Sequence, residues 1–266
     1  TAEQTVYLEI LHALQNYIEE MPLSTTETEV VDLAFQCVLM DHPEIFWSVK
    51  FSYKYYKDSD HAEMIPEYLF KKKQILEHQK ALDSRIKKIV RGAEKLSEQE
   101  KELYIHDFIC QNVHYDKLKK QYSHEIIGPL GQGVGVCEGI AKTVKILCDA
   151  LGIWCIIAIS EANPEKGIKY RHAWNILKLD GEHFHLDATF DNSLGHDGVI
   201  RYDYFNLDDA RLFRDHEPVI YPVPACTRSD RSYYRENKLS FTKIEDVCKR
   251  AQMPIRKDLP FVFHWR

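Results

Sequence analysis

The sequence predicts an α+β protein, in which a mainly helical first part is followed by a helix packed on an antiparallel sheet. Three observations support this class. Apolar residues recur at helical spacing in the first twenty positions. An apolar segment over residues 137–151 ends at Gly152, a natural helix stop. Three strand-like segments then follow, at residues 153–160, 170–179 and 182–188.

The first hundred residues are predicted to contain three helices and one strand. Ser24 and Glu27 have the spacing of a capping box that would open the second helix. Ser97 and Glu100 have the same spacing, and they predict a further helix that runs to about Val113. The four expected elements cover residues 3–20, 24–41, 71–96 (helices) and 46–56 (strand).

The chemistry is expected near residues 128–137. Glycine and proline are concentrated over residues 128–135, which predicts a loop with tight turns or close backbone approaches. Cys137 follows this loop at the start of an apolar helix. The free N–H groups and the dipole at a helix start favour a thiolate, and they can stabilise an oxyanion. The alternative is a buried structural cysteine, which we expect for Cys148 and Cys155.

A nucleophilic thiol needs a base, and the base needs an orienting acceptor. His172 lies 35 residues after Cys137, and Asp187 lies 15 residues further on. Asp180-Gly181 predicts a tight hairpin between the strands that carry them, so the two side chains can be neighbours. His185 shares a strand face with Asp187 and competes as the base, and Asp191 competes as the acid. Spacing alone leaves both alternatives open.

Three ordered motifs resemble the transglutaminase-like superfamily. They are GVGVCEGIA at 133–141, HAWN at 172–175 and LDATFD at 186–191, and Tyr115-Asp116 resembles a further element upstream. The resemblance implies that Cys137 is the nucleophile, His172 the base and Asp187 the acid. It also implies a papain-like core, with the cysteine-bearing helix packed on the sheet. We expect a compact, prokaryotic-type member, without the extra β domains of the animal tissue enzymes.

The family chemistry is acyl transfer through a thioester. The resemblance implies a protein or peptide substrate whose amide, on a glutamine side chain, is attacked by the thiolate. Transfer to a lysine amine gives a transglutaminase, and transfer to water gives a cysteine peptidase or amidase. A non-catalytic binding or scaffolding relative is a third alternative. Gln132 and Tyr115 are candidates for contacts to the oxyanion or the thiol. Trp174 is a candidate for lining the site, although a strand tryptophan is more often core.

Composition and residue spacing also bear on which partners, cofactors and metals the protein binds. The chain has 266 residues and a formal net charge of −6, which gives no indication of nucleic-acid or membrane binding. No cofactor is expected. No metal is expected either, because the acidic stretch 196–209 lacks EF-hand spacing and the cysteines and histidines lack a second ligand pair. The oligomeric state is left open.

The seven cysteines, an odd number without C-x-x-C spacing, favour free thiols and a cytoplasmic location. A secreted or cell-surface protein with its leader removed is the alternative. We expect three regions: a mainly helical N-terminal region over 1–96, a transglutaminase-like catalytic core over 97–225, and a C-terminal extension over 226–266 that packs on the core.

Overall fold

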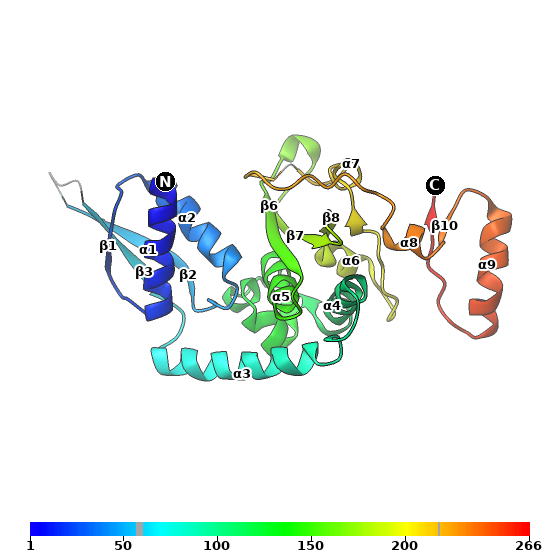
Figure 1. Cartoon of the computed structure of the whole chain (residues 1–266), viewed down its shortest axis with the longest axis horizontal. Coiled ribbons are helices and arrows are strands. Elements are labelled where there is room, and N and C mark those ends of the chain that lie inside the picture. Colours follow the sequence, from blue (N-terminus) through cyan, green and yellow to red (C-terminus); the bar gives the residue numbers. More distant parts are fainter. Residues whose placement is uncertain (57–60, 218) are drawn as a thin grey trace.

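The computed structural model describes residues 1–56, 61–217 and 219–266, and its parts lie in a row (Figure 1). An N-terminal unit, blue in the figure, lies at one end. The centre contains a helix and a four-stranded sheet, and the chain ends in a helical segment at the other end. Helix α3 (Lys72–Val90) runs along one side and connects the first unit to the centre. It is seven residues shorter than the predicted helix over 71–96.

The N-terminal unit consists of two helices and a three-stranded antiparallel sheet of strand order β1-β3-β2. Two helices and one strand of this unit confirm predicted elements. Strands β1 and β3 were not predicted, because β1 is very short and β3 contains a proline. The bounds are α1 (Ala2–Asn16), β1 (Met21–Leu23), α2 (Thr28–Asp41), β2 (Ser48–Tyr55) and β3 (Ala62–Tyr68).

The two predicted capping boxes have different outcomes. The one at Ser24 is wrong: helix α2 has Glu27 as its N-cap, with no side-chain cap. The backbone N–H of Ser24 instead donates to the carboxylate of Glu9 at 3.1 Å. The box at Ser97 is confirmed, because the Glu100 N–H donates to the Ser97 hydroxyl and the Ser97 N–H donates to the Glu100 carboxylate. It opens helix α4 (Glu98–Asn112).

The central sheet is antiparallel, with strand order β6-β7-β8-β9. The predicted hairpin between β7 and β8 is confirmed. Its two turn residues, Asp180 and Gly181, have φ values of 48° and 88°, as a type I′ turn requires. The bounds are β6 (Trp154–Ser160), β7 (His172–Leu179), β8 (Glu182–Leu186) and β9 (Phe205–Leu207).

Helix α5 (Cys137–Ala150) packs against β6 and β7 on one face of this sheet and against α4 on its other side. The Asn175 side chain of β7 donates to the Ala141 carbonyl of α5 at 3.0 Å. The opposite face of the sheet is covered by a smaller apolar cluster. Its members are Ala158, Trp174, Ile176, Leu207, Leu212 and Cys226. The α+β class, with the cysteine-bearing helix on an antiparallel sheet, is confirmed.

We predicted that the glycine-rich segment before Cys137 would be a loop, but the structure shows regular elements there. Gly128–Gln132 forms a π-helical turn, and β5 (Val134–Gly135) then pairs in parallel with β4 (His114–Tyr115). The predicted close backbone approach does occur here. A Cβ on Gly128 would lie 2.6 Å from the Tyr122 carbonyl oxygen and 2.7 Å from that of Val134. This packing fixes the position of the chain as it enters α5.

A buried ion pair anchors the start of α5. The Lys142 ammonium, which is not exposed at all, lies 2.6 Å from a Glu125 oxygen and 3.0 Å from a Glu138 oxygen. Glu125 belongs to the segment that precedes the π-helical turn, and Glu138 follows Cys137 directly. The pair therefore holds the first turn of α5 against the segment that leads into it.

The chain after β9 contains short elements that were not predicted. Tyr233 stacks on Tyr202 with ring centroids 3.6 Å apart, so the first part of the extension packs on the centre. Helix α9 lies at the far end of the row (Figure 1). No helix in the described ranges is long and apolar enough to span a bilayer. The elements are α7 (Asp209–Leu212), α8 (Tyr233–Glu236), β10 (Ser240–Phe241), α9 (Ile244–Arg256) and β11 (His264–Trp265).

Candidate active site

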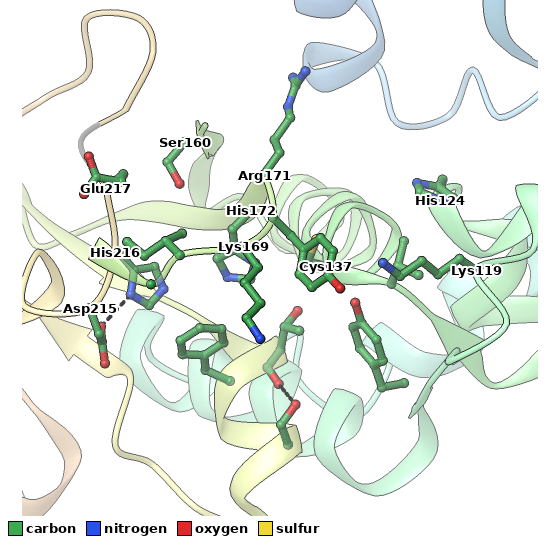
Figure 2. Close-up of a pocket in the computed structure, with 18 residues that line it drawn as sticks. Lys119, His124, Cys137, Ser160, Lys169, Arg171, His172, Asp215, His216 and Glu217 are labelled. Carbon is green, nitrogen blue, oxygen red and sulfur yellow. Dashed lines mark hydrogen bonds and ion pairs between the residues drawn. The ribbon is translucent and has the colours of Figure 1, made fainter. Parts of the chain in front are cut away.

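Cys137 is the first residue of α5, after the N-cap Val136. Its half-buried thiol lines a cleft of about 590 Å³ (Figure 2). The backbone N–H groups in the first turn of a helix have no intrahelical acceptors, and they carry the positive end of the helix dipole. The thiol therefore lies where a negative charge, on sulfur or on a substrate oxygen, is stabilised.

His172 and Asp187 reach the same place from neighbouring elements. His172 begins β7 and lines the cleft beside Cys137. Its Nε2 lies 2.5 Å from Oδ2 of Asp187, which is fully buried. We predicted that Asp187 would end a strand, and this is wrong, because β8 ends at Leu186 and Asp187 is the N-cap of helix α6 (Ala188–Leu194). Its Oδ1 accepts from two N–H groups of that helix, at 2.9 and 3.0 Å.

The charges in this group depend on one another. Burial disfavours the charged form of His172, but the charge and hydrogen bond of Asp187, with a hydrogen bond to Cys137, outweigh it and raise the pKa to about 10. Burial likewise disfavours the ionised form of Asp187, but His172 and His216 outweigh it and hold its pKa well below the usual range. His172 therefore keeps its proton at neutral pH, which places an imidazolium beside Cys137.

His216 belongs to this group and was missed in the sequence. Its Nε2 lies 2.9 Å from the same Asp187 oxygen that contacts His172, and its Nδ1 lies 2.7 Å from a carboxylate oxygen of Asp215. The ring is buried and lies 4.6 Å from that of Phe190, centroid to centroid. Both ring nitrogens face carboxylates, so His216 helps to fix the position of Asp187. No motif spacing indicated it, because it lies in an irregular segment.

The other candidate residues have different positions. Tyr115 lines the cleft, and burial together with the negative charge of Cys137 raises the pKa of its phenol, so the two side chains are close. Trp174 is buried behind the site: its ring stacks on His172 and donates to His185 at 3.0 Å. It belongs to the small apolar cluster rather than to the cleft lining. Gln132 is exposed at the end of the π-helical turn and is not among the lining residues, which does not support it as an oxyanion donor.

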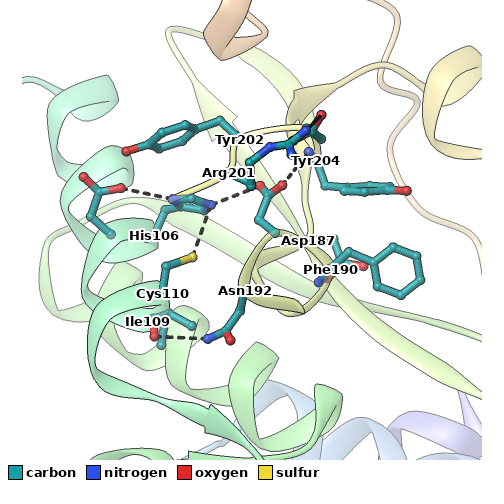
Figure 3. A network of polar contacts seen from close by, with 12 residues as sticks. His106, Ile109, Cys110, Asp187, Phe190, Asn192, Arg201, Tyr202 and Tyr204 are labelled. Carbon is teal, nitrogen blue, oxygen red and sulfur yellow. Dashed lines mark hydrogen bonds and ion pairs between the residues drawn. The ribbon is translucent and has the colours of Figure 1, made fainter. Parts of the chain in front are cut away.

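His185 and Asp191, the alternative base and acid left open by the sequence, do not line the cleft. His185 is buried and contacts Asp209 at 2.8 Å rather than the cleft. Asp191 is buried on the far side of α6 and contacts His106 at 3.0 Å. Figure 3 shows His106 with Cys110 on α4, in a polar network that also contains Asp187. Neither His185 nor His106 lines the cleft, whereas His172 and His216 do.

Two clusters in the described ranges bring possible metal ligands together: His172, Asp187 and His216, and His185, Asp209 and Cys226. The second fits a metal poorly. Its histidine accepts from Trp174 at Nδ1, so the proton lies on Nε2, which donates to Asp209. A metal at Nε2 would require a deprotonated ring. In the first cluster, the raised pKa of His172 keeps its ring protonated and opposes metal binding.

A thiol, an imidazolium and a buried carboxylate lie around one cleft, in a papain-like arrangement. Residues 83–188 match a family model described as Transglutaminase-like superfamily, and this part of the chain is a transglutaminase-like domain. The match includes Cys137, His172 and Asp187 but ends before His216. No curated protein matches the chain.

Several solved structures resemble part of the chain, among them the following two. One is described as a TGase (14% identity, TM-score 0.37), and it aligns over 53% of this chain and 44% of its own length. The other is described as a "Putative Cysteine Protease" from Cytophaga hutchinsonii (17% identity, TM-score 0.35), and it aligns over 53% of this chain and 62% of its own length. The chain thus spans less than two thirds of either protein.

Proposed function

We propose that this protein is a transglutaminase-type thiol acyltransferase, which takes the acyl group from glutamine side chains of a protein or peptide. The observation that supports this most is the position of Cys137. It lies at a helix N-terminus, in one cleft with a histidine whose proton is held by a buried aspartate. Members of this superfamily are typically enzymes.

The proposed reaction begins with attack of the Cys137 thiolate on the carboxamide carbon. The developing oxyanion is stabilised by N–H groups at the start of α5. His172 then gives its proton to the leaving nitrogen, ammonia departs, and a thioester remains on Cys137. A primary amine attacks the thioester while neutral His172 takes its proton. Collapse forms the new amide and restores the thiolate and the imidazolium.

Asp187 acts in both half-reactions without changing its own protonation state. It stabilises the imidazolium while His172 is charged, and it orients the ring through the bond to Nε2, so that Nδ1 remains available for the substrate. If water replaces the amine, the same three residues hydrolyse the thioester to a carboxylic acid. The choice of acceptor therefore depends on what else binds in the cleft.

The test is incorporation of a fluorescent primary amine into a glutamine-bearing protein, with released ammonia measured in parallel. We expect fluorescent product and ammonia in equal amounts, and neither with Cys137→Ala. Cys248→Ala, which removes an exposed thiol far along the chain, is the matched control and retains activity. Ammonia without amine incorporation would show an amidase instead. Activity in the Cys137→Ala variant would contradict the proposal.

A further inference from the structure

The cleft around Cys137 has an uneven distribution of charge. Lys119 and Lys169 both line it, from different loops, and Figure 2 shows both side chains near Cys137. The Lys119 ammonium lies 4.3 Å from the centre of the Tyr170 ring, which is also part of the lining. An ammonium on the face of an aromatic ring keeps its full charge. Two ammonium groups therefore line the same cleft as the Cys137 thiol.

These two charges are not neutralised by the protein. Within the described ranges, neither Lys119 nor Lys169 forms an ion pair with a carboxylate. The two acidic residues of the lining, by contrast, are paired: Glu217 lies 2.7 Å from Lys166, and Asp215 contacts His216. The whole chain carries a formal charge of −6. The unpaired charges of the cleft lining are therefore opposite in sign to the net charge of the protein.

The rest of the lining is mostly apolar and suits the acyl part of a substrate. Val136, Ile168 and Phe190 contribute to it. A glutamine side chain can place its methylene groups against such residues while its carboxamide reaches Cys137. Neighbouring groups of the substrate then lie beside the two lysines. The two lysines attract carboxylates of the substrate and repel its ammonium groups. A charged cleft also raises the local concentration of ligands with the opposite charge.

We infer that the cleft selects acidic acyl donors, in which aspartate or glutamate residues adjoin the reacting glutamine. Lys119 and Lys169 are the residues that determine this preference. The inference rests on the proposed function, because it assumes that Cys137 attacks an amide of a peptide or protein. It adds the chemical class of the substrate, which the catalytic residues do not determine.

The experiment uses three peptides that share one glutamine and differ only in its two neighbours, which are glutamate, serine or lysine. Ammonia release is measured with one amine acceptor, because it reports turnover whether the amine or water resolves the thioester. We expect kcat/KM to follow the order glutamate, serine, lysine, and the glutamate advantage to shrink as salt is added, because salt screens exposed charges. Each of Lys119→Gln and Lys169→Gln should lower the glutamate-to-serine ratio about two- to five-fold.

Lys120→Gln is the matched control, because Lys120 lies in the same loop as Lys119. Its side chain lies over Tyr122 and does not line the cleft. It should leave the ratio unchanged. Equal rates for the three peptides, or a preference that survives Lys119→Gln/Lys169→Gln, would overturn the inference.

A separate measurement distinguishes this inference from the proposed function. The same peptides are titrated into Cys137→Ala, and their affinities are compared by calorimetry. If no peptide is turned over by the wild type but the glutamate peptide binds most tightly to the variant, the acyl-transfer proposal fails and the charge preference stands. If no peptide is turned over and the three affinities are equal, the charge preference fails as well.

Discussion

Replacing Asp187 with asparagine is expected to lower kcat by roughly three to four orders of magnitude, as loss of the orienting carboxylate does in serine proteases. The folded chain would keep a similar shape at this position. It would lose the charge that outweighs burial and raises the pKa of His172 to about 10. His172 would then be mainly neutral at pH 7 and could not donate its proton to the leaving nitrogen.

The titration of His172, followed by NMR, is the direct measurement. The pKa should fall from about 10 in the wild type towards the ordinary value of 6.5 in Asp187→Asn. A raised pKa stabilises the folded state fully below pH 6.5, and this contribution is lost as the pH rises through about 10. The stability difference between wild type and variant should therefore narrow over that range.

Asp191→Asn is the matched control for this variant. It removes an equally buried carboxylate from the same helix, but that carboxylate contacts His106 rather than His172. We expect a loss of stability with the His172 titration unchanged. A normal His172 pKa in the wild type, or an active Asp187→Asn enzyme, would show that Asp187 does not have the role assigned to it.

Gly139→Ala is expected to be the most damaging of the small substitutions near the site. A Cβ at this position would lie 2.2 Å from the backbone oxygen of Ser123, so the backbone must move. The same oxygen accepts the Val136 N–H at 3.0 Å, directly before Cys137. Overpacking of this kind costs about 1–3 kcal/mol. The shift would also displace the thiol from His172, so activity should fall further than stability alone explains.

Thermal unfolding and kcat are measured together for this variant. A loss of this size lowers Tm by roughly 2–4 °C per kcal/mol in a chain of this length class. Gly131→Ala is the control in the preceding segment, because the nearest atom to its Cβ would be an Ile127 methylene carbon at the ordinary distance of 3.6 Å. Wild-type stability and activity in Gly139→Ala would show that the helix start tolerates movement.

Local signals in the sequence were sufficient for the elements that carry Cys137 and His172. The tight turn at Asp180-Gly181 and the helix stop at Gly152 are governed by backbone sterics that act within a few residues. The structure of the glycine-rich segment was harder to predict. Its need for close approach was clear, but the π-helical turn is imposed by packing against Tyr122 and Val134 and not by local preference.

The site was predicted only as far as its motifs extend. The three ordered motifs indicated Cys137, His172 and Asp187, which the structure brings together around one cleft. The contact of His216 with Asp187 spans 29 residues and comes from a segment without periodicity. Such a contact depends on how the chain after β9 crosses the sheet. No local pattern encodes that path.

Selective alkylation tests most directly whether Cys137 is an activated thiol. Wild type and His172→Gln are treated briefly with limiting iodoacetamide near pH 7, and the labelled cysteines are identified by mass spectrometry. Exposure alone would favour Cys248, because it is exposed and Cys137 is half-buried. An activated Cys137 is labelled first among the seven cysteines of the wild type and loses this preference in the variant. Labelling of Cys137 no faster than Cys248 in the wild type would contradict it.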